Sequence, residues 1–152
     1  MAIRRAARDD MPAVALLHRL TMTTSLPYLP YLHTPAQDLA FFRDVLFDRG
    51  EVWVAQDADG AIVAYAARSP GWLDHLYVLP SHHGQGLGHA LLEQARADVS
   101  AIQLWAFQRN TRARAFYEAH GFTLQRLTDG SGNEEREPDV LYAWTRPPIT
   151  NR

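Results

Sequence analysis

The sequence predicts an α/β (α+β) fold with a mixed sheet, and three observations support this class. A hairpin signal, Asp57-Ala-Asp-Gly60, joins two apolar runs near the middle of the chain. After this hairpin, strand-like and helix-like segments alternate as far as Val140–Thr145. The length of 152 residues, with 47% hydrophobic and 21% charged residues, is typical of a single globular domain, here residues 1–152.

The first 25 residues predict a strand followed by a helix. The apolar start Ala2–Ala6 indicates a short strand. Asp9 or Asp10 can then cap a helix whose first turn contains Pro12, where the missing N–H costs little. One face of this helix contains Val14, Leu17 and His18.

The next segment predicts a loop and a second helix. Two prolines in Leu26–His33 argue against a regular helix there. Thr34-Pro-Ala-Gln37 fits a capping box with proline at the first helical position. Apolar residues then recur at helical spacing until Gly50 ends the pattern. These apolar residues are Leu39, Phe42, Val45 and Leu46.

The remaining elements alternate between strands and helices. Glu51–Gln56 and Ala61–Arg68 are the two strands of the predicted hairpin, and Trp72–Leu79 is a third strand that Pro80 ends. The later elements are a helix that runs through Val99, a strand at Ile102–Phe107, a helix at Asn110–His120 closed by Gly121, and strands at Phe122–Arg126 and Val140–Thr145.

Composition excludes several classes of protein. A formal net charge of −2 argues against a nucleic-acid-binding protein that depends on a basic surface. The absence of cysteine excludes disulfides, zinc–thiolate sites and thiol nucleophiles. All 15 basic residues are arginine, which excludes Schiff-base chemistry and the lysine of a P-loop nucleotidase. The longest apolar run, Ala61–Ala67, is too short to span a membrane, and no secretory signal follows Arg8, so we expect a cytoplasmic protein.

A glycine-rich turn after the third strand is the most informative segment. Gly84, Gly86 and Gly88 lie between this strand and a helix start, where backbone N–H groups can converge on an anion. A pyrophosphate can therefore be held without lysine, although a simple flexible connection is the alternative. The spacing is not Gly-x-Gly-x-x-Gly, and Gln108 stands near the position of the expected ribose-binding acid. A nicotinamide or flavin fold is therefore disfavoured.

A second block lies in the predicted helix after Ile102–Phe107. It reads Asn110-x-x-Ala-x-x-Phe116-Tyr117-x-x-x-Gly121-Phe, and by spacing alone Tyr117 is a core aromatic residue. Together, the two blocks resemble the GNAT superfamily of N-acetyltransferases. The family's cofactor motif, Arg/Gln-x-x-Gly-x-Gly/Ala, corresponds to His83-Gly-Gln-Gly-Leu-Gly88, with histidine at the place usually held by Arg or Gln.

The resemblance implies a GNAT-like, mostly antiparallel sheet of six to seven strands with about four flanking helices. It also implies acetyl-CoA as cosubstrate, with the pantetheine arm along the third strand and the pyrophosphate in the glycine turn. The acetyl thioester would lie in the cleft between Trp72–Leu79 and Ile102–Phe107. The implied cofactor-binding residues are Leu76, Tyr77, Val78, His83, Gly84, Gln85, Gly86, Leu87, Gly88, His89, Asn110 and Phe116.

The candidate catalytic groups are one phenol and two carboxylates. The resemblance implies Tyr117 as the general acid that protonates the leaving thiolate. Asp74 is a candidate general base on the third strand, although a solvated acid at a strand end is the alternative. His75 points away from Asp74 in that register, which favours a structural role. Glu134 lies in an acidic loop, residues 129–139. It could attract a cationic amine or relay its proton, and a solvated side chain is the alternative.

The acceptor and any metal are less constrained by the sequence. Candidate substrate-binding residues are Tyr28, Tyr31, His33 and Glu135. We expect no metal site, because the histidines of the glycine turn lack the His-Glu-x-x-His spacing and the acidic loop lacks the calcium-loop pattern.

The resulting functional prediction is an N-acetyltransferase that uses direct attack by a primary amine of a small molecule or peptide. We expect no nucleic-acid or membrane partner, and a homodimer is compatible with the resemblance because dimers are common in the family. The alternative, from a different functional class, is a non-catalytic acyl-CoA-binding sensor of the same fold.

Overall fold

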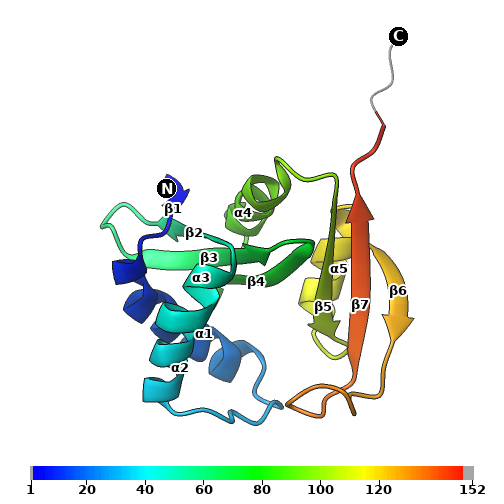
Figure 1. The fold of residues 1–152 in the computed structure, drawn as a ribbon, viewed down its shortest axis with the longest axis horizontal. Coiled ribbons are helices and arrows are strands. Elements are labelled where there is room, and N and C mark those ends of the chain that lie inside the picture. Colours follow the sequence, from blue (N-terminus) through cyan, green and yellow to red (C-terminus); the bar gives the residue numbers. More distant parts are fainter. Residues whose placement is uncertain (1, 149–152) are drawn as a thin grey trace. The chain divides into compact units, whose positions relative to one another are not determined.

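A computed structural model describes residues 2–148 of the chain (Figure 1). The predicted α/β class is confirmed, with seven strands and four helical segments. The chain divides into two compact units, Met1–Ala95 and Arg96–Arg152. Among the described residues, no helix is long and apolar enough to cross a membrane.

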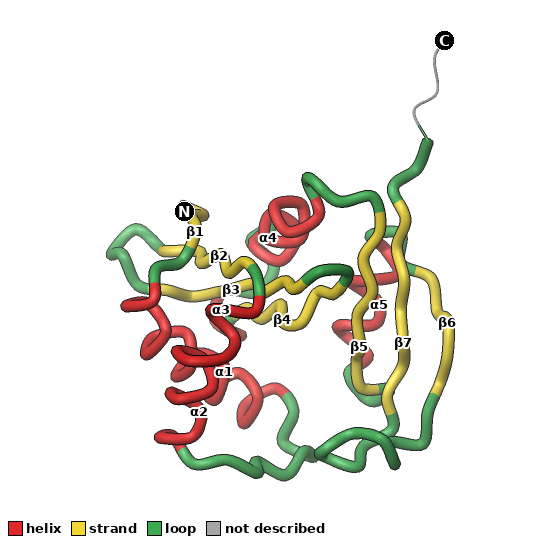
Figure 2. Tube along the Cα trace, viewed as in Figure 1, coloured by secondary structure: helices red, strands yellow, loops and turns green. Residues whose placement is uncertain are grey.

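The N-terminal unit contains four antiparallel strands, drawn in yellow in Figure 2. They are β1 (Ala2–Arg5), β2 (Glu51–Gln56), β3 (Ile62–Ser69) and β4 (Trp72–Val78), and they pair in this order. The hairpin between β2 and β3 forms as predicted. Its turn is held by the Asp57 carboxylate, which accepts hydrogen bonds from the N–H groups of Asp59 and Ala61 at 2.9 and 3.0 Å.

The first helix, α1 (Met11–Ser25), starts one residue after Asp10 but is not capped by it. The Asp10 side chain makes no N-cap hydrogen bond, so this part of the prediction is wrong. Its carboxylate instead accepts hydrogen bonds from the Ala7 N–H and the Arg4 guanidinium. These bonds lower the pKa of Asp10 and tie the end of β1 to the start of α1.

The second helical segment starts as predicted and then departs from a regular α-helix. In the capping box, Gln37 N–H donates to Thr34 Oγ1 at 3.2 Å and Thr34 N–H donates to Gln37 Oε1 at 2.9 Å. The segment comprises α2 (Pro35–Phe41), a π-helical turn (Phe42–Leu46) and α3 (Phe47–Arg49). The wider π turn places Phe42 and Leu46 in the core, both 2% exposed, and turns Val45 outward to 44% exposure. The sequence pattern had placed all three on one face.

Each face of this four-stranded sheet is covered by a helix. The core on one face contains Met11, Val14, Ala15, Leu17, Phe42, Leu46, Val52, Val54, Tyr65 and Ala67. On the other face, α4 (Leu87–Arg96) buries Leu91, Leu92 and Ala95. Arg68 of β3 holds the end of this helix, because its guanidinium donates to the Ala95 carbonyl at 2.6 Å.

The C-terminal unit contains a three-stranded antiparallel sheet and one helix. The strands pair in the order β5 (Ala101–Phe107), β7 (Asp139–Thr145) and β6 (Thr123–Leu127), and α5 spans Thr111–Ala119. Arg96 lies over the ring of Trp144 at 4.6 Å, and Arg146 lies over the same ring at 5.2 Å. The Arg146 guanidinium also donates to the carbonyls of Arg96, Ala97 and Val99. Arginine side chains therefore satisfy the backbone where the chain leaves α4.

Candidate functional site

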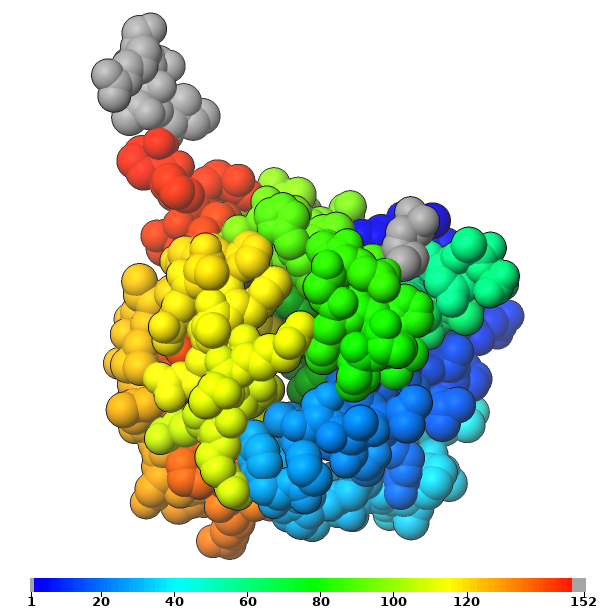
Figure 3. All heavy atoms as spheres, turned by 180° about the vertical axis from the view of Figure 1, so that it is seen from behind, coloured from blue at the N-terminus to red at the C-terminus, as the bar shows by residue number. Residues whose placement is uncertain are grey.

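The loop between β4 and α4 lies on the surface of the N-terminal unit, in the green region of Figure 3. A short 3-10 turn, Pro80–His82, follows β4, and α4 begins at Leu87. Gly84 and Gly86 have φ angles of +79° and +80°, in the left-handed region that favours glycine. A Cβ atom built on either residue meets no heavy atom within 4 Å. Both positions therefore require glycine for backbone shape and leave open space above the loop.

The N–H groups of this loop are available to a ligand. Within residues 2–148, no hydrogen bond joins the N–H of Gly84 or Gly86 to another residue. The first N–H groups of α4 have no partner inside the helix, and the helix start adds partial positive charge. Donors of this kind around a left-handed backbone form an anion-binding concavity. The loop therefore offers the donors that a pyrophosphate requires, and its binding of acetyl-CoA stays a prediction.

His83, at the unusual position of the glycine motif, folds the loop back onto β4. Its Nε2 atom lies 3.0 Å from the carbonyl oxygen of Val78. A carbonyl can only accept a hydrogen bond, so Nε2 carries the proton. In this structure the side chain supports the loop, and its contact with a cofactor stays a prediction.

Asp74 is the extra residue of a β-bulge in β4. Arg68 pairs with Leu73 and Ala67 pairs with His75, so Asp74 has no partner on β3. Its Oδ2 atom is buried and forms no hydrogen bond with any described residue. A buried carboxylate oxygen without a donor is costly in a folded protein, and bulges often direct side chains at active sites. Asp74 therefore has one carboxylate oxygen that accepts no hydrogen bond from the described residues, and its role as general base stays a prediction.

A chain of three polar side chains crosses the core beneath β4. The hydroxyl of Tyr65 lies 2.8 Å from Nδ1 of His18 and 2.7 Å from Nδ1 of His75. The helical spacing predicts His18 on the apolar face of its helix but gives no sign of this contact, because the three residues come from α1, β3 and β4. Burial lowers the pKa of His18 to about 4, against a smaller opposing effect of Asp38. Burial likewise lowers the pKa of His75 well below its ordinary value.

These lowered pKa values predict acid destabilisation. A histidine that is neutral when folded but protonates near pH 6.5 when unfolded stabilises the protein above pH 6.5, and this contribution is lost as the pH falls toward 4. For His18 the loss is about 3 kcal/mol at pH 4. Urea unfolding at a series of pH values measures it. His18→Asn keeps an amide near the Nδ1 position but cannot titrate, so its unfolding free energy should fall less between pH 6.5 and 5. Parallel curves for the two proteins would contradict the assignment.

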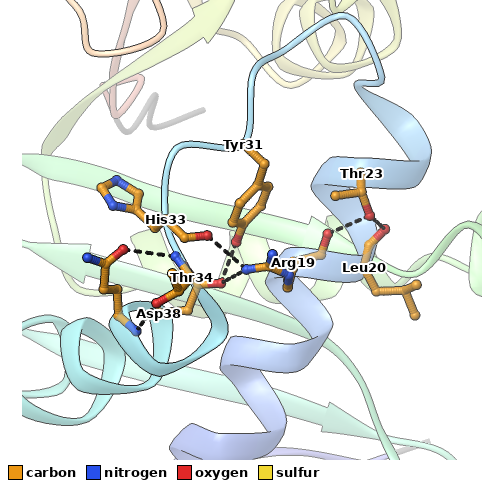
Figure 4. A network of polar contacts seen from close by, with 8 residues as sticks. Arg19, Leu20, Thr23, Tyr31, His33, Thr34 and Asp38 are labelled. Atoms are coloured by element: carbon orange, nitrogen blue, oxygen red, sulfur yellow. Dashed lines mark hydrogen bonds and ion pairs between the residues drawn. The ribbon is translucent and has the colours of Figure 1, made fainter.

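The loop after α1 is held by a network around the buried carboxylate of Asp38 (Figure 4). The Tyr31 hydroxyl donates to Asp38 Oδ2 at 2.6 Å, and Arg19 Nη1 donates to the same oxygen at 3.1 Å. Arg19 also lies over the Tyr31 ring at 4.3 Å and donates to the His33 carbonyl at 3.0 Å. Burial and the contact with Asp38 raise the pKa of Tyr31.

This network changes how the acceptor-side candidates are interpreted. The Tyr31 hydroxyl already serves a structural contact, whereas the His33 side chain is exposed and Tyr28 is half-buried. Asp38 was not singled out from the sequence, because its partners Tyr31 and Arg19 lie in a different turn and a different helix. Substrate contact by Tyr28, Tyr31 and His33 stays a prediction.

Asp38→Ala should destabilise the protein by about 2–3 kcal/mol, because it leaves the Arg19 charge and the Tyr31 hydroxyl without their partner. Asp44→Ala is the matched control, since Asp44 pairs with Arg43 at an exposed position. Thermal unfolding should shift for Asp38→Ala and stay unchanged for the control. Equal unfolding temperatures for all three proteins would show that the network contributes nothing to stability.

In the C-terminal unit, Tyr117 lies on α5 and is 8% exposed. Its ring packs against Phe122 and Tyr142, with centroid distances of 5.4 and 6.3 Å. Asn110 caps α5, because its Oδ1 accepts a hydrogen bond from Ala113 N–H at 3.2 Å. Phe116, half-buried on the same helix, lies 4.1 Å from the His120 ring. Asn110 and Phe116 therefore have structural contacts of their own, and their cofactor contacts stay predictions.

The acidic loop, residues 129–139, connects β6 to the first residue of β7 and is held by Arg109 and by its own side chains. Arg109 forms a two-pronged ion pair with Glu137 at 2.8 and 2.7 Å. Asp139 accepts hydrogen bonds from Thr128 and Asn133. These contacts turn Glu137 and Asp139 inward, while Glu134 is exposed and Glu135 is half-buried. Among residues 2–148, no cluster of three or more His, Asp or Glu side chains could hold a metal ion.

The chain is similar in sequence and in fold to several known acetyltransferases. A family profile described as "Acetyltransferase (GNAT) domain" matches residues 48–124. The peptidyl-lysine N-acetyltransferase YiaC of Escherichia coli is 25% identical over 144 residues, covering 93% of this chain and 95% of that protein. The phosphinothricin acetyltransferase of Sinorhizobium meliloti, solved with acetyl-CoA, has a TM-score of 0.75 at 20% identity and covers 95% of this chain and 87% of that one. The spermidine N-acetyltransferase SpeG of Vibrio cholerae has a TM-score of 0.68 at 14% identity, with 95% of each chain covered.

Proposed function

Because the chain belongs to the GNAT acetyltransferase family, we propose that it transfers the acetyl group of acetyl-CoA to a primary amine of a small molecule or peptide. The observation that carries this proposal is the loop after β4, where Gly84 and Gly86 adopt left-handed conformations. Their N–H groups have no partner among residues 2–148. Two left-handed glycines with open N–H groups at the start of a helix give the donors that an anionic ligand requires.

When bound, acetyl-CoA supplies an acetyl thioester as the electrophile. The N–H groups of residues 84–88 would hold its pyrophosphate. The chain contains no lysine, so backbone donors at a helix start are suited to take the place of a lysine side chain. The backbone of Leu76 and Val78 on β4 would bind the pantetheine arm in the manner of an added strand.

Asp74 is the carboxylate best suited to remove the amine proton. An alkyl amine with a pKa like that of lysine is neutral in only about one molecule in 2,500 at pH 7, so the reaction needs a proton acceptor. Asp74 offers a buried oxygen without a hydrogen bond to any described residue, and it lies in a bulge of the proposed cofactor strand. Glu134 is exposed on the acidic loop, where attraction of a cationic amine is the better-supported role.

Tyr117 is proposed as the acid that protonates the departing thiolate. A phenol has an ordinary pKa near 10, so it keeps its proton at neutral pH and can release it as negative charge develops on sulfur. The side chain is held in place by Phe122 and Tyr142, which limits the positions its hydroxyl can occupy. A rigidly held donor is what this step requires.

The function is tested by incubating the purified protein with acetyl-CoA and a panel of amines. Peptidyl lysine and spermidine belong in the panel, because relatives carry these acceptors in their names. Released CoA is measured with a thiol reagent, and the chain itself adds no background because it has no cysteine. Amine-dependent thiol release supports the enzyme. Stabilisation by acetyl-CoA with no turnover across the panel would favour the sensor instead.

A further inference from the structure

The number of protons in the hydrogen-bond chain His18–Tyr65–His75 determines the tautomers of its two histidines. The Tyr65 hydroxyl has one proton, so it donates to one Nδ1 and must accept from the other. The two neutral histidines therefore hold opposite tautomers, and each ring has a fixed orientation. No hydrogen bond to either Nε2 atom is found within residues 2–148. The Nδ1 contacts are therefore the hydrogen bonds that orient the two rings.

We propose that this chain positions the Asp74 carboxylate by fixing the β4 bulge from beneath. The inference rests on the proposed function, in which Asp74 accepts the amine proton. Asp74 itself has no partner residue on β3, so its orientation depends on its two neighbours in sequence. Leu73 on one side is buried in the core, and His75 on the other is held by Tyr65.

The chain joins three elements at this point. Tyr65 comes from β3 and is fully buried, His18 comes from α1, and His75 is the residue that resumes the β3–β4 pairing opposite Ala67. The His18 and His75 rings lie 5.2 Å apart between centroids, and Phe42 and Tyr77 pack against both. A rotation of His75 would therefore be resisted from the helix and from the neighbouring strand.

Stability alone does not explain why His18, Tyr65 and His75 occupy this core. Apolar side chains of similar volume usually stabilise a buried position at least as well as a hydrogen-bonded polar set. Hydrogen bonds differ in being directional, which suits a positioning role. The charged groups that influence the two histidines are Asp38, which favours protonation of His18, and Arg49, which disfavours protonation of His75.

Paired substitutions at His75 test the proposal. His75→Asn places an amide close to the Nδ1 position, where Tyr65 can still bond to it, whereas His75→Gln places the amide near Nε2. We expect His75→Gln and Tyr65→Phe to lower kcat at least about tenfold, with KM for acetyl-CoA changed less than about twofold. His75→Asn should recover most of the wild-type kcat. Val14→Ala is the control, because it removes buried volume from the same core without breaking a hydrogen bond.

The possible results separate the alternatives. Equal loss in His75→Asn and His75→Gln would overturn positioning through Nδ1. Equal loss of kcat in Val14→Ala and Tyr65→Phe would overturn it as well, because it would attribute the effect to general weakening of the core. NMR of the histidine ring nitrogens adds a readout that needs no turnover: wild type should show one Nδ1–H and one Nε2–H tautomer for this pair. Two identical tautomers would refute the chain itself. Wild-type protein that acetylates no amine would refute the proposed function, and the positioning role with it, even where the tautomers are as expected.

Discussion

Gly86→Val is expected to abolish CoA binding, which we put at a loss of at least about 100-fold in affinity, or roughly 2.7 kcal/mol. The wild-type φ of +80° is strained for a β-branched residue, so the loop would reorganise and its N–H groups would no longer converge. An added Cβ on Gly86 would meet no heavy atom of the protein within 4 Å. The loss of affinity would therefore come from the changed backbone and from a clash with the ligand, and not from a clash inside the protein. Isothermal titration calorimetry with CoA measures the change.

Gly60→Val provides a matched control. Gly60 has a φ of +83° and, like Gly86, no heavy atom within 4 Å of an added Cβ, but it lies in the β2–β3 hairpin turn. Both variants should lose stability by about 1–2 kcal/mol from strain. Only Gly86→Val should lose CoA binding. Unchanged CoA affinity in a folded Gly86→Val protein would remove the loop from the cofactor site.

Tyr117→Phe is expected to lower kcat by about 100- to 1,000-fold, which is the usual contribution of a general acid. Affinity for CoA should change little, since the substitution removes one hydroxyl and keeps the ring that packs against Phe122 and Tyr142. Steady-state kinetics and calorimetry together separate the two effects. The pH–rate profile should also lose the limb that reports protonation of the acid.

The control for this variant is Tyr142→Phe, which keeps the ring that packs against Tyr117. The Tyr142 hydroxyl donates a hydrogen bond to Glu118 of α5. A general disturbance of this helix would therefore also lower the kcat of the control variant. If both variants lose activity equally, α5 has been disturbed and Tyr117 has no demonstrated role. Equal rates in Tyr117→Phe and wild type would show that the leaving thiolate takes its proton from elsewhere.

Features that depend on neighbours in sequence could be predicted. The capping box at Thr34, the hairpin turn at Asp57 and the left-handed glycines of the loop at Gly84 and Gly86 each follow from residues within a few positions of one another. The same holds for the helix that begins after Asn110. Local geometry at these points is decided by hydrogen bonds and φ angles that a short segment determines by itself.

Features that depend on distant partners could not. The bulge at Asp74 arises from the pairing of β4 with β3, and nothing in its own strand marks it. The π turn at Phe42–Leu46 departs from the α-helical spacing that the apolar pattern suggested. Likewise, the Tyr65 hydroxyl and the Asp38 carboxylate find their partners only when helices and strands pack together. The bulge and the hydrogen-bond chain around Asp74 therefore emerge only from the tertiary structure, whereas Asp74 itself and the glycine-rich turn are candidates that the sequence already indicates.

The guanidinium groups that brace the backbone at Ala95 and around Trp144 have a chemical consequence for a protein that handles a reactive thioester. A lysine at any of these positions could be acylated on its amine. Acylation would remove the positive charge and the hydrogen bonds to the backbone carbonyls. The guanidinium groups of Arg68, Arg96 and Arg146 are poor nucleophiles, because their charge is delocalised over a planar group. These arginine side chains would therefore stay unmodified, and keep their hydrogen bonds to the backbone, during long exposure to high concentrations of an acetyl donor.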